Sequence, residues 1–142
     1  MNDNLLKNAS ASGVYYLSGS RHSAIEAAAS RARFCLLAAN ITKPSSTEAV
    51  LSELGSAFQF PIWYGANFDA LYDCLTDPDW LPAKGHVLVI NGIANRRAAD
   101  PDDFATLIEV LQTAAESRRD SHSPFWILLD APARGIPAFP EA

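Results

Sequence analysis

Four short, continuous apolar runs are the feature that most limits how this chain can fold. They are VYYL (14–17), FCLLAA (34–39), VLVI (87–90) and FWILL (125–129). Each run has the length of a strand, and its residues do not alternate with polar ones, as they would in a strand with one solvated face. Continuous runs of this kind indicate strands that are covered on both sides. We therefore expect a sheet that lies between layers of other structure.

Helical patterns separate these runs. Residues 23–32 are rich in alanine, and residues 47–58 and 103–119 repeat apolar side chains at helical spacing. Ser45 and Glu48 fit a capping box at the start of the second helix. Strands that alternate with helices predict an α/β fold in α/β/α layers, with a small, mostly parallel β-sheet flanked by helices.

The length and the connections indicate how the chain is organised. At 142 residues it is most simply a single domain, residues 1–142, with enough chain to bury a sizeable core. Residues 75–85 and 92–103 are rich in proline, glycine and aspartate, and predict connecting loops. The last segment, 131–142, has three prolines and no periodicity, so we expect an extended or disordered tail.

Charge and hydropathy argue against several classes of partner. The formal net charge is −5, and the arginine pairs Arg96-Arg97 and Arg118-Arg119 have no aromatic residues interleaved with them, so we expect no nucleic-acid partner. We interpret both pairs as solvated charges of loops and helix ends. No apolar stretch is long enough for a signal peptide or a membrane span, which predicts a cytoplasmic protein without a membrane partner.

The two cysteines, Cys35 and Cys74, lie far apart in the sequence. They lack the paired spacing of a zinc site or a disulfide framework. We expect both to be buried thiols in a reducing compartment, and we expect no metal and no cofactor.

Residues 67–77, NFDALYDCLTD, predict a helix with an acidic side. Asp69, Asp73 and Asp77 follow one another at every fourth position, and Tyr72 lies at the edge of this side. The opposite side carries the apolar residues Phe68, Ala70, Leu71, Cys74 and Leu75. Each like-charged i, i+4 pair costs an isolated helix roughly 0.2–0.5 kcal/mol, so this arrangement requires an explanation.

Local structure accounts for two of the three carboxylates. Asp69 lies in the first helical turn after the predicted cap residue, Asn67, where the helix dipole favours a negative charge. Asp77 precedes Pro78 and suits a turn. Asp73 lies in mid-helix, where no cap or turn explains it, so it is either a solvated surface charge or a binding residue.

The loop before this helix, FPIWYGAN (60–67), is rich in aromatic residues. Phe60, Trp63 and Tyr64 lie next to a turn at Gly65, and side chains of this kind are either a hydrophobic plug or binding anchors. Beside a line of carboxylates without cations, they indicate a surface that binds a cationic partner.

The run FPIWYGANFDALYDCLTD resembles the signature of the barstar family of intracellular ribonuclease inhibitors. The resemblance is specific from Pro61 to Thr76, and a weaker similarity extends over residues 34–130. It implies the family's three-stranded parallel sheet, to which the first thirty or so residues would add an N-terminal strand and helix.

The resemblance also implies a mechanism and a partner. In this family the acidic helix and its loop plug the active site of a basic ribonuclease, and carboxylates take the places of substrate phosphates. Asp73 would be the central phosphate mimic and Asp69 a second charged contact. Trp63 would pack on a side chain of the catalytic site.

Other residues would complete this interface. Tyr72 and Thr76 would border the plug, Gly65 and Asn67 would shape the loop, and Trp80 would replace an aromatic residue that follows the family's helix. A residue of the last helix, Glu109, Thr113 or Glu116, would join them. The expected partner-binding residues are Trp63, Tyr64, Gly65, Asn67, Asp69, Tyr72, Asp73, Thr76, Asp77 and Trp80.

Two other functions fit the same residues. Asp69 and Asp73 could share one Mg²⁺ ion in a metal-dependent hydrolase. Against this, His22, His86 and His122 are scattered and are expected at the surface or at strand edges, and the chain has no glycine-rich phosphate loop. The acidic helix could also be a general module that binds basic protein surfaces.

Overall fold

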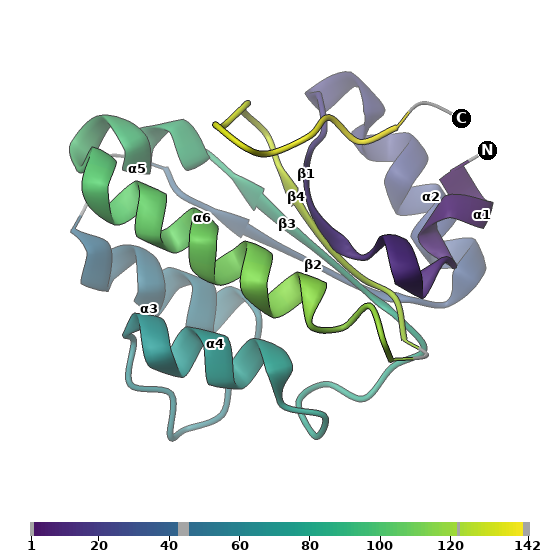
Figure 1. Ribbon diagram of the computed structural model, residues 1–142, viewed down its shortest axis with the longest axis horizontal. Helices are drawn as coiled ribbons and strands as arrows, with labels where there is room; N and C mark the ends of the chain where they lie inside the picture. Colours follow the sequence, from purple (N-terminus) through teal and green to yellow (C-terminus); the bar gives the residue numbers. More distant parts are fainter. Residues whose placement is uncertain (1, 43–45, 122, 141–142) are drawn as a thin grey trace.

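The computed structural model describes residues 2–42, 46–121 and 123–140 (Figure 1). Its strands are β1 (Gly13–Tyr16), β2 (Cys35–Asn40), β3 (His86–Asn91) and β4 (Phe125–Leu129). Its α-helices are α1 (Asn2–Leu6), α2 (His22–Ala32), α3 (Thr47–Ala57), α4 (Phe68–Thr76), α5 (Ile93–Ala99) and α6 (Pro101–Glu116), with short 3₁₀ helices η1 (Ala9–Ala11) and η2 (Gly19–Arg21). No helix in the described part of the chain is long and apolar enough to cross a membrane.

All four apolar runs form strands of one parallel sheet, with the order β1-β4-β3-β2. Leu88 of β3 lies opposite Leu37 of β2 on one side and Ile127 of β4 on the other. The interior strands are the most buried ones, because every residue of β4 and every residue of β3 except Asn91 is buried. The predicted α/β fold with a small parallel sheet is therefore confirmed.

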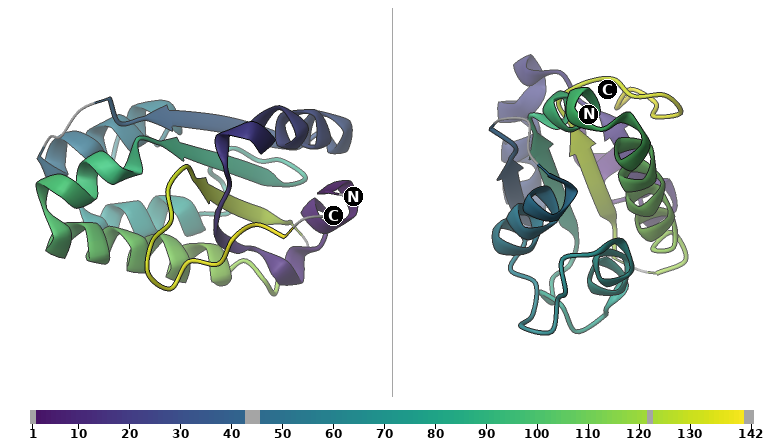
Figure 2. Two further views of the ribbon diagram at one scale, coloured as in Figure 1. Left: turned by 90° about the horizontal axis from the view of Figure 1, so that it is seen from above. Right: turned by 90° about the vertical axis from the view of Figure 1, so that its left-hand side faces the viewer.

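Helices cover both faces of the sheet, as continuous apolar strands require (Figure 1, Figure 2). On β4, Phe125, Ile127 and Leu129 point into a core under α3, α4 and α6. Trp126 and Leu128 point into a second core under α1 and α2. The expected N-terminal additions are present: β1 extends the sheet beside β4, and α2 covers its second face.

The start of α3 differs slightly from the prediction. Its cap is Ser46, whose Oγ accepts a hydrogen bond from the Ala49 amide at 3.1 Å. Ser45, which was expected in a capping box with Glu48, lies outside the described residues. The predicted apolar side of the helix is confirmed, because Val50, Leu51 and Leu54 are buried.

Residues 92–103 were predicted to form a loop, and that prediction is wrong, because they include α5 and the start of α6. The carboxylate of Asp130, which follows β4, accepts hydrogen bonds from the amides of Gly92 and Ile93 at 2.7 and 3.3 Å. The first turn of α5 is therefore held by a residue far away in the sequence, and no local pattern indicated it.

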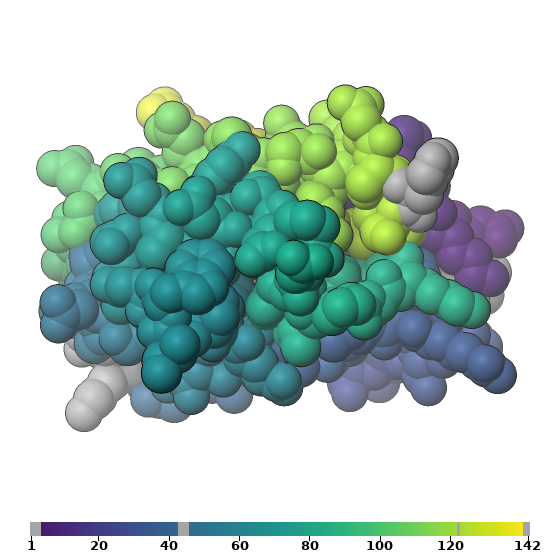
Figure 3. Space-filling view, turned by 90° about the horizontal axis from the view of Figure 1, so that it is seen from below, coloured from purple at the N-terminus to yellow at the C-terminus, as the bar shows by residue number. Residues whose placement is uncertain are grey.

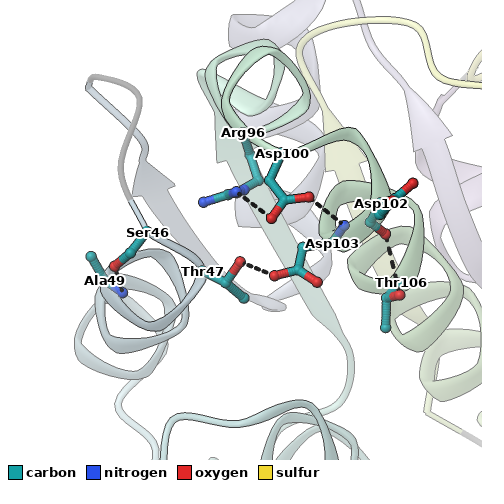
Figure 4. Close-up of polar contacts among 8 residues, drawn as sticks. All are labelled: Ser46, Thr47, Ala49, Arg96, Asp100, Asp102, Asp103 and Thr106. Atoms are coloured by element: carbon teal, nitrogen blue, oxygen red, sulfur yellow. Dashed lines mark hydrogen bonds and ion pairs between the residues drawn. The ribbon is translucent and has the colours of Figure 1, made fainter.

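Arg96 is not a solvated charge, contrary to the prediction, because it is only 3% exposed. Its guanidinium lies 3.7 Å from the carboxylate of Asp100, which also caps α6 by accepting from the Asp103 amide. Asp103 in turn accepts a hydrogen bond from the Thr47 hydroxyl of α3. These side chains join α3, α5 and α6 (Figure 4).

Arg118 and Arg119 are also tied to the fold. Arg118 donates to the Leu75 carbonyl at the end of α4 at 3.0 Å, and its guanidinium lies 4.8 Å from the centre of the Phe125 ring. Burial lowers the pKa of Arg118. Arg119 donates to the Ser12 carbonyl at 2.7 Å. The second arginine pair therefore holds α4 and β1 in place and is not simply solvated.

The segment after β4 returns to the edge of the sheet. The Tyr16 amide donates to the Pro137 carbonyl at 2.9 Å, and the Phe139 amide donates to the Tyr16 carbonyl at 2.7 Å. Phe139 is buried against Trp126, with 5.5 Å between the ring centres. This part of the tail lies along β1 as an extended segment.

His86 is buried at the start of the interior strand β3, contrary to the expected surface or edge position. Its Nε2 lies 2.6 Å from the Leu81 carbonyl, and its ring stacks on Trp80 at 5.3 Å between centres. His22 is half-buried, and His122 lies outside the described residues. The His86 ring therefore links the loop after α4 to the sheet.

We expect the protein to lose stability as the pH falls below about 6.5. Burial lowers the pKa of His86 from its ordinary 6.5, and Arg118 lowers it further, while the Leu81 carbonyl acts in the opposite direction. The unfolded chain therefore takes up a proton that the folded chain resists, and the free energy of unfolding decreases as the pH is lowered. Urea unfolding between pH 7.5 and 5.5 measures this slope.

The variant His86→Gln keeps a donor for Leu81 but does not titrate, so its slope over this range should be flatter. Equal slopes for the two proteins would contradict the assignment to His86.

Candidate functional site

The helix α4 has the two sides that its sequence predicts. Asn67 caps it, because its Oδ1 accepts from the Ala70 amide at 2.7 Å. Leu71, Cys74 and Leu75 are buried, and the two leucines belong to the core that α4 shares with α6. The remaining side of the helix faces solvent, so packing fixes which side chains are presented outward.

Asp69 and Asp73 are both exposed on this outer side. Asp77 follows the helix and forms the expected turn, since its Oδ1 accepts from the Asp79 amide at 2.8 Å. Within the described residues, no lysine, arginine or histidine lies within ion-pair distance of these carboxylates, and the ion pairs of the structure involve other acids. The acidic side of α4 is therefore not neutralised by cations of the described chain.

The negative charge of α4 also acts on its buried side. Burial, together with smaller contributions from the carboxylates of Asp77 and Asp73, raises the pKa of the Cys74 thiol to about 11. Both aspartates thus oppose the formation of another negative charge at this helix.

We expect Cys74 to resist alkylation in the folded protein. Its thiol is buried and protonated at pH 8, whereas Cys35 is only partly buried, although burial raises its pKa as well. Treatment with iodoacetamide at pH 8, followed by mass spectrometry, should show Cys35 modified first and Cys74 at least about tenfold more slowly. In urea the two rates should become equal. Equal rates in the folded protein would contradict the burial of Cys74.

The loop before α4 is anchored by one aromatic residue and presents another. The Tyr64 hydroxyl donates to the Leu51 carbonyl at 2.8 Å, and its ring lies so close to Gly55 that a Cβ atom there would come within 2.5 Å. Trp63 is 54% exposed. Ile62 beside it is completely exposed and was not among the predicted binding residues, although an apolar residue between Pro61 and Trp63 was a signal.

A hollow lies between this loop and the acidic side of α4. Its lining residues are Trp63, Gly65, Asn67, Phe68, Asp69, Ala70 and Asp73. In the space-filling view, the teal segment that contains the loop and α4 lies across the middle of the molecule (Figure 3). The structure therefore brings an exposed aromatic ring and two carboxylates to one recess, as the sequence suggested.

The other predicted site residues lie in different environments. Tyr72 is 36% exposed beside this surface, and the Thr76 hydroxyl donates to the Tyr72 carbonyl at 2.8 Å. Trp80, in contrast, is only 6% exposed and its Nε1 donates to the Phe58 carbonyl at 2.9 Å. Trp80 is therefore a core residue that supports the loop, and its contact with a partner stays a prediction.

The three residues of the last helix that were expected to include a further binding residue lie on α6. Glu109, Thr113 and Glu116 are exposed on α6, which packs beside α4. The Thr113 hydroxyl donates to the Glu109 carbonyl at 2.9 Å, and Glu116 lies 3.9 Å from Arg119.

As for metals, no three histidine, cysteine, aspartate or glutamate side chains in the described part of the chain converge in an arrangement that could hold an ion.

Comparison with known proteins shows the family of this chain. No curated protein matches the chain. A family model with the description Barstar (barnase inhibitor) matches residues 34–130, which include the strands β2, β3 and β4, the loop and α4. The match covers well over half of the chain, and we conclude that this protein belongs to the barstar (barnase inhibitor) family.

Proposed function

We propose that this chain inhibits a ribonuclease, or a ribonuclease-like toxin, by filling its active site with α4 and the preceding loop. Membership of the barstar family supports this function, because the family is described as barnase inhibitors. The exposed carboxylates of α4 support the mechanism. The chain would then act as an immunity protein that protects its own cell in the cytoplasm.

The position and exposure of Asp73 are the observation that supports the proposal most directly. It lies in the middle of α4, is exposed, and has no cation of the described chain within ion-pair distance. A ribonuclease holds the phosphate of its substrate with basic side chains, and a carboxylate can accept the same charge-assisted hydrogen bonds. Asp69 lies one turn away, about 6 Å along the helix axis, so both can address cations of one active site.

The aromatic loop supplies the apolar part of the proposed interface. Trp63 is exposed next to the carboxylates, and Ile62, which precedes it in the chain, is exposed as well. Large exposed side chains of this kind often carry most of the energy of a protein interface. Tyr64 and Trp80 hold the loop from within through their hydrogen bonds to backbone carbonyls. The loop is thus fixed before binding, which lowers the entropic cost of association.

The proposed contact set is close to the one the sequence suggested. It consists of Ile62, Trp63, Gly65, Asn67, Asp69, Tyr72, Asp73, Thr76 and Asp77. Tyr64 and Trp80 support this set from behind. We further propose that the chain is one domain, and that it needs neither metal nor cofactor for inhibition.

A cleavage assay tests the proposal directly. A small basic ribonuclease of the barnase class is mixed with increasing amounts of this protein, and cleavage of a fluorogenic RNA is followed. We expect activity to disappear as the molar ratio approaches one, with or without EDTA. Full activity at a large excess would contradict inhibition of this class of enzyme. Saturable Mg²⁺ binding at Asp69 and Asp73 without inhibition would favour the hydrolase.

A further inference from the structure

A second recess lies on the face of the sheet opposite α4, between α2 and the ends of the strands. It is a cavity of about 130 Å³. Its lining residues are Leu17, His22, Ile25, Glu26, Leu36, Ala38, Val89 and Asn91. An apolar cavity of about 150 Å³ is large enough to hold benzene, so this space suits a ligand of similar size.

The topology of the sheet places α2 on the face opposite the other crossover helices. The chain leaves β1 to form α2 on one face, whereas it leaves β2 and β3 to form α3 and α5 with α6 on the other side. Leu17 follows β1 and Asn91 ends β3, two strands that are separated by β4 in the sheet. Both β1 and α2 precede the part of the chain that matches the barstar family.

The polar groups of the cavity are all able to accept hydrogen bonds. His22 Nε2 is buried and has no hydrogen-bond partner among the described residues. It is an acceptor in the tautomer that carries the proton on Nδ1. Asn91 donates its Nδ2 to Asn40 at 3.0 Å, which leaves its Oδ1 as an acceptor. Glu26 lies one helical turn after His22 and adds a carboxylate.

We propose that this cavity binds a small primary amine, in its ammonium form, with an apolar body. An ammonium group has three donors and no acceptor, and His22, Asn91 and Glu26 supply three acceptors. The apolar body would lie against side chains of both the helix and the sheet, namely Leu17, Ile25, Leu36 and Val89. A buried polar atom without a partner costs free energy, and the ligand would remove that cost at His22.

Benzylamine is a suitable probe, because a benzene ring fits the volume of the cavity and the amine carries the required charge. We expect chemical-shift changes in ¹H–¹⁵N spectra at His22, Glu26 and Asn91 that saturate with a dissociation constant of about 1 mM. Benzyl alcohol should bind about tenfold more weakly and benzoate should not bind, because both lack the ammonium group. Equal binding of all three compounds, or shifts scattered over the surface, would overturn the proposal.

Two variants test the role of the cavity. Glu26→Gln should weaken benzylamine about tenfold and leave benzyl alcohol unchanged, since only the amine carries a charge. Ala38→Leu fills the cavity from the exposed edge strand and should abolish the binding of both compounds. Ala27→Leu, on the exposed side of α2 and outside the cavity, is the matched control and should bind as the wild type does. Unchanged binding by Ala38→Leu would overturn the proposal.

Discussion

The variant Asp73→Ala should retain its fold, but its inhibition constant for the target ribonuclease should be at least about a hundredfold higher. In the proposed complex the carboxylate of Asp73 lies among basic side chains of the enzyme, away from water. Removal of one member of a buried, hydrogen-bonded charge pair costs about 3–5 kcal/mol, because the remaining charge stays desolvated without a partner. Asp73 is exposed in the free protein and makes no side-chain contact in the described structure that the fold needs. Inhibition constants and urea unfolding measure the two effects separately.

Asp102→Ala is the matched control for this experiment. Asp102 is exposed in the first turn of α6, so the variant loses the same charge at a different place. It should inhibit as the wild type does, apart from a small reduction in the association rate from the lower net charge. An equal loss of inhibition in both variants would show that net charge, and not the position of Asp73, determines binding. Unchanged inhibition by Asp73→Ala would remove the basis of the proposed mechanism.

The largest loss of stability near the site is expected for Trp80→Ala. The indole of Trp80 is enclosed by Phe60, His86 and Phe125, with ring centres 5.4, 5.3 and 6.2 Å away, and its Nε1 donates to the Phe58 carbonyl. Truncation of a buried tryptophan to alanine costs about 3–5 kcal/mol, and here the loss of a hydrogen bond adds to the cavity. Urea unfolding followed by far-UV circular dichroism measures this loss.

Trp63→Ala is the contrasting variant in the same segment of the chain. Trp63 is 54% exposed, so its removal should change the free energy of unfolding by less than about 0.5 kcal/mol. Its inhibition of the ribonuclease should nevertheless fall by at least about tenfold, because the exposed ring is a proposed anchor. If the two tryptophan variants lost similar stability, the assignment of Trp80 to the core and Trp63 to the surface would be wrong.

The identity and orientation of α4 could be predicted from its own residues. Asn67 is a good cap, the apolar residues recur at helical spacing, and the carboxylates occupy the other side. The four strands were equally evident, since uninterrupted apolar runs require cover on both faces. These features depend on interactions between neighbours in the chain, and such interactions leave a periodic pattern in the sequence.

Other features depend on residues that are distant in the sequence. Trp80 was expected among the partner-binding residues, and the fold places it in the core, where Phe58 and His86 enclose it. Arg96 lies in a segment that was predicted to be a loop and was interpreted as a solvated charge, whereas the fold buries it beside Asp100. The helix α5 was missed because its first amides are bound by Asp130.

The sequence by itself therefore determined the class of the fold, the outward position of Asp69 and Asp73, and the likeness to a family of inhibitors. The tertiary structure decided which tryptophan is exposed, that no cation of the described chain neutralises α4, and that a cavity lined by the buried Nε2 atom of His22 lies under α2. The physical reason is that burial and ion pairing depend on where the folded chain places distant side chains. A periodic pattern fixes only the side of a helix or strand on which a residue lies.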